Sequence, residues 1–259
     1  MSYKIDKKYI EQAINAFYKL IDGKKEGEPD TRYKSWEWCY DAFRKGKQEY
    51  DITEEEEIVD YLSLHLGFYL ASWGMYRGSS YLLQRDYKAH KKVVEMILKA
   101  DKSLWGFNPT SDNDIKNARE MLFGKNGLYM EIKNGYNNDK KSNDDDYNNY
   151  ENSKEDYASD TLVTKILLGT LGCVPAFDRF LKKGIRWLKE KYQDNDINEI
   201  NATIENRGEP GSTFVALSNF AKDNNETLKL NNDGAAEYPV MKCVDMFLWQ
   251  VGYELDVLE

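Results

Sequence analysis

The spacing of apolar residues constrains this chain most, because it repeats with the period of an α-helix along most of its length. Near the start, Ile10, Ile14, Phe17, Tyr18 and Ile21 fall at helical spacing and form one apolar face. Alternating patterns typical of β-strands are scarce, so the sequence predicts an all-α fold. Similar spacing predicts a helix that starts at Ser35 and one that is capped by Thr53 and runs from Glu54 to Trp73. It predicts others over residues 81–98, 114–123, 161–171, 176–192, 212–222 and 240–253.

One stretch departs from the helical pattern. Residues 135–156 read GYNNDKKSNDDDYNNYENSKED and contain almost nothing that can be buried. The composition predicts a low-complexity, mobile acidic surface loop or insertion. The remaining pattern is continuous, so we expect a single helical domain over residues 1–259, with this loop inside it.

Composition limits the classes of function. The formal net charge of −9 argues against a protein that coats nucleic acid with its whole surface. No apolar run reaches the ~18–20 residues that span a bilayer, and the first residues lack the apolar core of a secretory signal. We therefore expect a cytoplasmic protein without a membrane partner. Cys39, Cys173 and Cys243 are predicted to be reduced, structural thiols.

Motifs for metals and cofactors are missing from the sequence. It has no glycine-rich phosphate loop, no HExxH pair and no Asp-rich calcium loop, and its cysteines do not lie at metal-ligand spacing. We therefore expect no metal and no cofactor. Of the two histidines, His65 lies on an apolar stripe, which favours a core histidine. His90 lies among lysines, and we interpret it as part of a basic face.

Two segments are basic within this acidic chain. Residues 161–192 carry seven Lys or Arg against two acidic residues, and residues 77–99 carry six against two. Such segments are usually solvated helix faces. Each of these two, however, coincides with an unusual local motif, which favours a functional role.

The first motif is SWGMYRGSSYLLQRDYKAH, residues 72–90. Its RGSS turn, residues 77–80, places two hydroxyls and backbone N–H groups at a helix start, which is a geometry that binds anions such as nucleic-acid phosphate. The alternative is an ordinary N-cap in a helical hairpin. The residues predicted to bind an anion or nucleic acid here are Arg77, Ser79, Ser80, Lys88, Lys91 and Lys92.

The second motif is DTLVTKILLGTLGCVPAFDRF, residues 160–180. Its apolar residues are predicted to be core, with Gly172 ending one helix and Pro175 beginning the next. Packing does not explain Lys165 and Asp178. A lysine near an apolar core can act as a nucleophile, and a nearby carboxylate can hold a cationic intermediate. The alternatives are a salt bridge between consecutive helices, or a lysine whose tip reaches solvent.

A threonine–lysine pair, an apolar helix and the VPAFD stretch together resemble helix–hairpin–helix DNA glycosylases over a short part of the chain. The resemblance implies that Lys165 displaces the base and that Asp178 is the catalytic acid. The stretch that corresponds to the family's Gly-rich hairpin, residues 157–163, contains no glycine, and the Lys-to-Asp spacing is shorter. The basic helix that follows adds predicted nucleic-acid contacts at Arg179, Lys182, Lys183 and Arg186.

A broader resemblance covers most of the chain. The blocks LHLGFYLASWGMYRGSS, DTLVTKILLGTLGCVPAFDRF and YPVMKCVDMFLWQ resemble a widespread group of bacterial helical proteins of unassigned function. This resemblance implies a shared helical fold and a bacterial source.

The sequence leaves three hypotheses for function. The first is a nucleic-acid-binding helical protein with a base-excision-like activity at Lys165 and Asp178. The second is a non-catalytic protein-interaction or regulatory module in a bacterial defence or stress system, with the acidic stretch at 135–156 as a contact for a protein partner. The third is a small-molecule enzyme with a carboxylate-lined pocket between helices.

Overall fold

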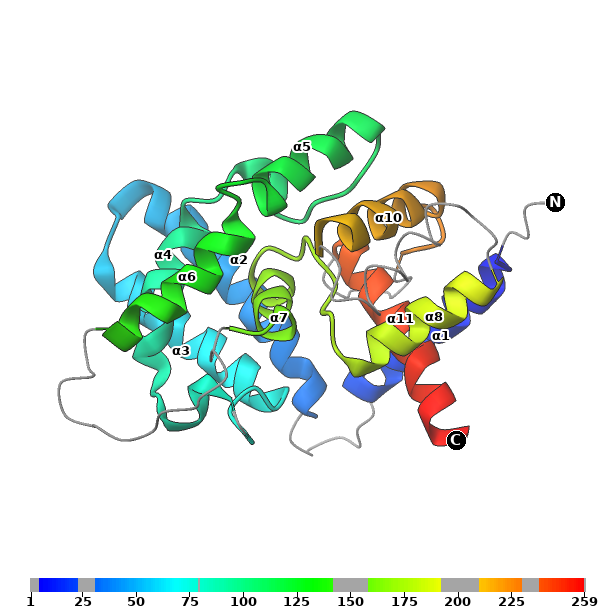
Figure 1. Ribbon diagram of the computed structural model, residues 1–259, viewed down its shortest axis with the longest axis horizontal. Helices are drawn as coiled ribbons and strands as arrows, with labels where there is room; N and C mark the ends of the chain where they lie inside the picture. Colours follow the sequence, from blue (N-terminus) through cyan, green and yellow to red (C-terminus); the bar gives the residue numbers. More distant parts are fainter. Residues whose placement is uncertain are drawn as a thin grey trace.

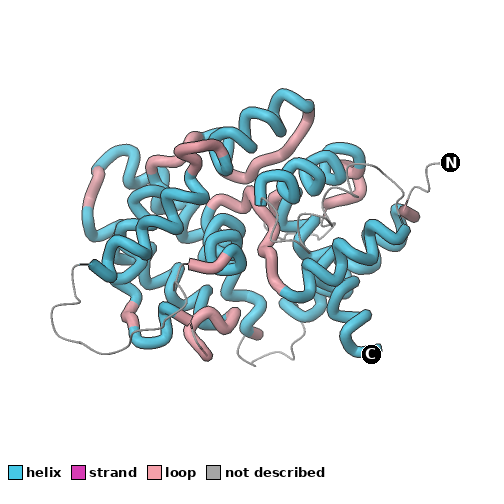
Figure 2. Tube along the Cα trace, in the orientation of Figure 1, coloured by secondary structure: helices cyan, strands magenta, loops and turns pink. Residues whose placement is uncertain are grey.

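The computed structural model describes residues 5–22, 31–78, 80–141, 158–191, 210–229 and 238–258. Within these ranges every regular element is helical and no strand occurs, so the predicted all-α class is confirmed (Figure 2). The α-helices are α1 (Lys7–Asp22), α2 (Ser35–Thr53), α3 (Glu56–Ser72), α4 (Lys91–Leu98), α5 (Asp112–Phe123), α6 (Leu128–Lys141), α7 (Asp160–Thr170), α8 (Arg179–Lys191), α10 (Pro210–Asp223) and α11 (Val240–Leu258). Short 3-10 helices are η1 (Arg32–Lys34), η2 (Tyr81–Gln84), η3 (Tyr87–His90) and η4 (Lys102–Leu104).

Two groups of helices lie on either side of α7 (Figure 1). In the first group α2 packs on α3, α3 on α4, and α4 on α6, while α7 contacts α2, α3 and α6. In the second group α11 packs on α1, α8 and α10. The first helix of the chain therefore lies beside the last one. One hydrophobic core cluster contains buried residues from both groups, so the two groups share a single core.

The contact between α8 and α11 is unusually close because glycines face the opposite backbone. A Cβ atom placed on Gly184 would lie 2.0 Å from the carbonyl oxygen of Leu248. A Cβ atom on Gly252 would lie 1.9 Å from the carbonyl oxygen of Phe180. No side chain fits at either position. This close approach holds the N-terminal end of α8, which follows Asp178, against α11.

Several predicted segments differ from the structure. The helix predicted from Glu54 with Thr53 as its cap begins only at Glu56, because Thr53 is the last residue of α2 and Glu54 follows it in the left-handed conformation, with φ 53°. The loop predicted at 135–156 is wrong over residues 135–141, because these residues continue α6; residues 142–157 lie outside the described residues. The single helix predicted over 81–98 is instead η2, η3 and α4. The reason is that the carboxylate of Asp86 accepts a hydrogen bond from the backbone N–H of Lys88 and so caps the start of η3 in the middle of the predicted helix.

The helix predicted from Ala176 begins only at Arg179. The backbone N–H of Ala176 donates to Asp245 and that of Phe177 donates to Thr164. Side chains from other helices thus take up these N–H groups, so the chain stays non-helical after Pro175 and enters the helix at Arg179.

The three cysteines are buried, in agreement with the predicted structural role. Burial raises the pKa of the Cys39 and Cys173 thiols, which keeps both protonated and unreactive near neutral pH.

Candidate functional site

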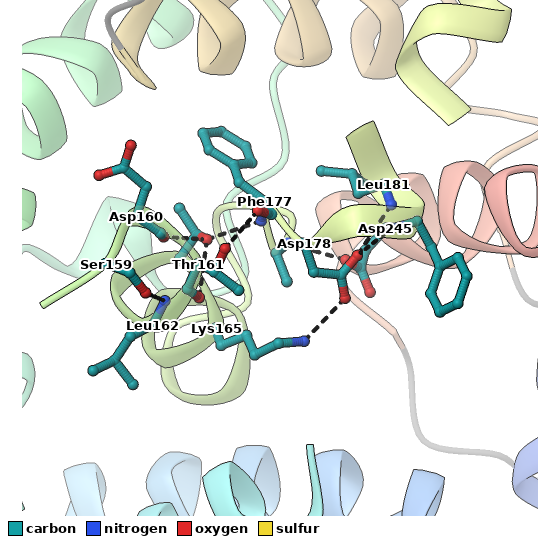
Figure 3. Close-up of polar contacts among 12 residues, drawn as sticks. Ser159, Asp160, Thr161, Leu162, Lys165, Phe177, Asp178, Leu181 and Asp245 are labelled. Carbon is teal, nitrogen blue, oxygen red and sulfur yellow. Dashed lines mark hydrogen bonds and ion pairs between the residues drawn. The ribbon is translucent and has the colours of Figure 1, made fainter. Parts of the chain in front are cut away.

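The two residues singled out in residues 160–180 meet in space. Lys165 Nζ on α7 lies 3.1 Å from Asp178 Oδ2, directly before α8 (Figure 3). The side chains are 4% and 16% exposed, respectively. The pair is therefore a largely buried salt bridge between consecutive helices. This geometry is also what a lysine nucleophile with a carboxylate partner requires, because proton exchange needs hydrogen-bond distance.

The Asp178 carboxylate is held by the first turn of α8. Its Oδ1 atom accepts hydrogen bonds from the backbone N–H groups of Phe180 at 3.1 Å and Leu181 at 3.0 Å. These are two of the N–H groups that a helix leaves without a partner at its start, and the helix dipole favours a negative charge there. Oδ1 therefore caps the helix, while Oδ2 faces Lys165.

Side chains from α7 and α11 position the turn that carries Asp178. Thr164 Oγ1 accepts from the backbone N–H of Phe177 at 2.9 Å, and Thr161 Oγ1 donates to the carbonyl of Phe177 at 2.8 Å. Asp245 Oδ1 accepts from the backbone N–H of Ala176 at 3.0 Å (Figure 3). The turn thus has fixed hydrogen bonds on both sides, so it holds the carboxylate in one place.

A second buried ion pair lies on α11, which the sequence analysis missed. Lys242 Nζ lies 2.9 Å from Asp245 Oδ2, and the side chains are 1% and 5% exposed. The ammonium group lies over the rings of Phe17 at 4.9 Å and Trp36 at 5.0 Å. The sequence pattern that could have identified this pair is the one that identified Lys165, namely charged residues inside a strongly apolar helix.

Trp73, at the end of α3, connects the two ion pairs. Its ring centroid lies 4.6 Å from Lys165 Nζ and 6.0 Å from Lys242 Nζ, both within the range of cation–π attraction. Its indole Nε1–H is buried and finds no acceptor among the described residues. The ring is therefore held by packing and by the two cations rather than by a hydrogen bond. Nearby, burial together with the charges of Asp245 and Asp178 raises the pKa of Tyr69, so its hydroxyl stays protonated.

Further aromatic rings continue from Trp73 toward the surface. Trp249 is buried and lies edge-on to Tyr33, Trp73 and Phe180, with centroids 6.0, 6.4 and 4.9 Å away. Tyr253 stacks on Trp249 at 5.3 Å and is 39% exposed. Tyr33, Trp73 and Phe180 are half-buried. The Lys165–Asp178 pair therefore lies below a set of partly exposed rings supplied by η1, α3, α8 and α11.

The anion-binding turn predicted at residues 77–80 is only partly supported by the geometry. Ser79 lies outside the described residues. Ser80 Oγ donates to the carbonyl of Met75 and caps η2, which has only four residues. The prediction that this turn opens a long helix is wrong, so the dipole of a long helix is absent. Arg77 is exposed at the turn.

The predicted lysines of the same segment do not share one role. Lys88 and Lys92 are exposed, as a binding face requires. Lys91 instead forms an ion pair with Asp60 at 2.8 Å, and it is half-buried. Its charge is therefore largely matched within the protein, which makes it a poorer nucleic-acid contact than predicted.

The basic residues of α8 are also partly neutralised. Arg179 and Lys183 both pair with Asp256 of α11, at 3.1 and 2.6 Å. The hydrogen bond from Lys183 lowers the pKa of Asp256, so this carboxylate stays charged. Lys182 is half-buried, and Arg186 is exposed. The net positive charge that α8 offers a partner is thus smaller than its sequence indicates.

His90 is not part of a basic face, and that interpretation was wrong. It is fully buried, with Nε2 2.5 Å from the Tyr76 hydroxyl and Nδ1 2.7 Å from the Tyr136 hydroxyl. His90 is the last residue of η3, and its side chain lies in the interior, whereas Lys88 and Lys92 are exposed. Burial lowers the pKa of His90 from 6.5 to about 4, against a smaller opposing effect of Asp86.

We expect His90 to make the stability of the protein depend on pH. Because its pKa is lower in the folded state, the unfolded chain takes up the proton more readily, and stability falls as the pH drops from about 6.5 toward 4. The full effect of a shift of this size is about 3 kcal/mol. Urea unfolding of wild type and His90→Gln across this range measures it. As the pH falls through this range, the free energy of unfolding of wild type should decrease by about 3 kcal/mol more than that of His90→Gln. A difference between the two proteins that does not change with pH would contradict the prediction.

A cavity of about 510 Å³ lies between α2 and the start of α11 and bears on the small-molecule hypothesis. Among the described residues its wall includes Arg44, Trp105, Lys229 and Tyr238, and no carboxylate. This cavity therefore lacks the carboxylate that the hypothesis requires. A second cavity, of about 420 Å³ between α5 and α10, has one carboxylate in its wall, that of Asp112, beside Lys116 and Arg119.

Comparisons with protein-family models, with curated proteins and with solved structures found no match to this chain. The two resemblances noted in the sequence therefore stay predictions. Among the described residues no helix combines the length and apolar character needed to span a bilayer. In the same ranges, no cluster of three or more His, Cys, Asp and Glu side chains is arranged to hold a metal ion.

Proposed function

We propose that this protein binds nucleic acid beside Trp73 and removes a base there, with Lys165 and Asp178 as the reacting pair. The observation that carries the proposal is the 3.1 Å contact between the Lys165 ammonium and the Asp178 carboxylate, under partly exposed aromatic rings. Such rings offer flat faces on which a base can stack. The charged pair offers both a nucleophile and a proton acceptor at hydrogen-bond distance.

The chemistry follows from the direction of the hydrogen bond. Lys165 Nζ donates to Asp178 Oδ2, so the proton that must leave the amine before attack has an acceptor in place. The amine then forms a bond to C1′ of the nucleotide while the bond between C1′ and the base breaks. The base leaves with the electron pair of that bond and takes up the proton from Asp178. The nitrogen bound to C1′ then carries two protons. Asp178, ionised again after it has protonated the base, takes one of them and passes it to the ring oxygen as the bond between C1′ and that oxygen breaks. The product is a protonated imine, which borohydride reduces to a stable amine.

Trapping on DNA tests this reaction. With oligonucleotides that carry an abasic site or a damaged base, borohydride should cross-link the wild-type protein, and Lys165→Met should give no adduct. Asp178→Asn should slow adduct formation on damaged bases by about 10²–10⁴-fold. Asparagine is as good an N-cap as aspartate, so α8 should stay capped in that variant.

Lys182→Met is the matched control, because Lys182 lies in the first turn of α8, four residues after Asp178. This variant should still form the adduct at saturating protein. An adduct that persists in Lys165→Met, or no adduct with any lesion for the wild type, would rule out the proposed reaction.

A specific observation also favours the second hypothesis, a protein-interaction module. Trp38, Tyr61, Leu64 and Phe68 on α2 and α3 are 42–55% exposed, and the rings of Trp38 and Phe68 lie 6.1 Å apart. Exposed apolar patches of this kind mark contact surfaces. If nucleic acid does not bind at low salt, this face becomes the preferred starting point. The acidic stretch proposed earlier as a contact lies mostly outside the described residues.

A further inference from the structure

Three exposed arginines surround the aromatic rings above the Lys165–Asp178 pair, although only two of them were predicted from the sequence. Arg32 lies over the rings of Tyr33 at 5.2 Å and Trp73 at 5.9 Å. Arg179 lies over the ring of Phe180 at 4.6 Å. We call the group formed by Arg32, Tyr33, Trp73, Arg77, Arg179, Phe180 and Tyr253 the arginine–aromatic surface.

Arg77 belongs to this surface because of the turn that follows α3. Gly74 has a positive φ of 75°, and a Cβ atom placed on it would lie 2.6 Å from Arg77 Nε. The guanidinium group therefore lies against the backbone next to Trp73. Only glycine allows both this conformation and this contact. The turn thus folds the Arg77 side chain back against Gly74, the residue that follows Trp73.

The charges of this surface favour one form of nucleic acid over another. Arg179 shares Asp256 with Lys183, and Lys91 of the other basic segment is paired with Asp60. With a net charge of −9, the protein offers few cations for the regularly spaced phosphates of a duplex. Partly exposed rings flanked by guanidinium groups suit bases that are free to stack, since a paired base hides its faces.

We infer that the arginine–aromatic surface binds an unpaired nucleotide within a single strand. The base stacks on the exposed parts of the rings, and the guanidinium groups contact the phosphates on either side. This inference rests on the proposed function, since it names the form of nucleic acid that the same site takes. A single strand would place its sugar above the Lys165–Asp178 pair.

Fluorescence anisotropy with a short labelled single strand and the corresponding duplex, at low and moderate salt, tests this inference. We expect the single strand to bind at least about tenfold more tightly than the duplex. Arg32→Gln/Arg77→Gln should weaken single-strand binding and reduce the dependence of log K on log salt by about 1 for each arginine removed. The matched control is Lys116→Gln/Lys125→Gln, which removes the same charge from exposed lysines on α5 and in the turn after it, outside the arginine–aromatic surface, and should change binding much less.

A second pair of variants tests stacking apart from charge. Tyr253→Ala should weaken single-strand binding by about tenfold. Tyr61→Ala, which removes a tyrosine that lies outside the surface and is more exposed (55% against 39%), should leave it unchanged. Equal affinity for single strand and duplex, or equal effects of the surface and control variants, would overturn the inference while leaving the proposed reaction standing. Absence of binding to either form would overturn both.

Discussion

Replacing Lys242 with methionine is expected to lower the free energy of unfolding by about 3–5 kcal/mol. Lys242 and Asp245 are 1% and 5% exposed, and their 2.9 Å contact balances two charges inside the core. Without the ammonium group, the carboxylate stays buried with no counter-ion, which is far more costly than losing an exposed pair. Urea unfolding followed by circular dichroism measures the change.

Two further variants separate the charge from simple loss of packing. Lys183→Met removes the lysine from a more exposed pair with Asp256, and we expect a loss below about 1 kcal/mol. Lys242→Met/Asp245→Asn removes both buried charges and keeps an oxygen that can accept from Ala176 N–H, so it should regain more than half of the loss. If Lys242→Met costs no more than Lys183→Met, the buried pair does not have the role assigned to it.

Asp245 also links this stability to the candidate site, because it holds the turn that carries Asp178. Hydrogen exchange at the backbone amides of Phe180 and Leu181 reports directly on the Asp178 cap. We therefore expect Lys242→Met to increase exchange at these two amides, even where the rest of α8 stays protected.

Gly184→Ala is expected to be the second strongly destabilising change, with a loss of about 3 kcal/mol or more. The added Cβ atom would lie 2.0 Å from the carbonyl oxygen of Leu248. The Cβ atom is fixed to the backbone of α8 and the carbonyl group belongs to the backbone of α11, so neither can rotate away. The helix α8 must therefore move away from α11 as a unit. Thermal and urea unfolding measure the loss. The same movement should shift Asp178 and abolish the borohydride adduct.

Gly135→Ala in α6 is the matched control. A Cβ atom there would meet side-chain atoms of Val93 and Met96 at 3.2–3.6 Å, which can adjust. Since alanine favours a helix interior over glycine by up to about 1 kcal/mol, this variant should be neutral or stabilised. A similar loss in both variants would show that the close approach of α8 and α11 is not the cause.

The helices themselves were largely predictable, because helical periodicity is a local property that each segment carries in its own residues. The patterns at residues 10–21, 161–171 and 240–253 correspond to α1, α7 and α11, within a few residues. The error at the start of α8 has a physical cause, since side chains of Thr164 and Asp245 take up backbone N–H groups from the approaching turn. Their positions depend on tertiary contacts that local periodicity does not contain.

The candidate site was predictable only in part. Lys165 and Asp178 stand out because charges are rare in apolar segments, and they are near each other in sequence. Lys242 and Asp245 are also charged residues within an apolar segment, but they were missed. Nothing in the local sequence distinguishes Arg32, because its role depends on aromatic rings from distant helices. His90 was assigned to the wrong face, because a run of lysines says nothing about the direction in which the next residue points.

The sequence by itself determined that the protein is all-α, where its principal helices lie, and that Lys165 and Asp178 are candidates for a reacting pair. Only the tertiary structure decided which charges are buried and paired, that Trp73 lies between two ammonium groups, and that arginines gather around the rings above them. The physical reason is the distance along the sequence between the residues that interact. Helix formation depends on neighbours within a turn or two, whereas burial and pairing depend on how α1, α7, α8 and α11 pack, across separations that reach the whole length of the chain.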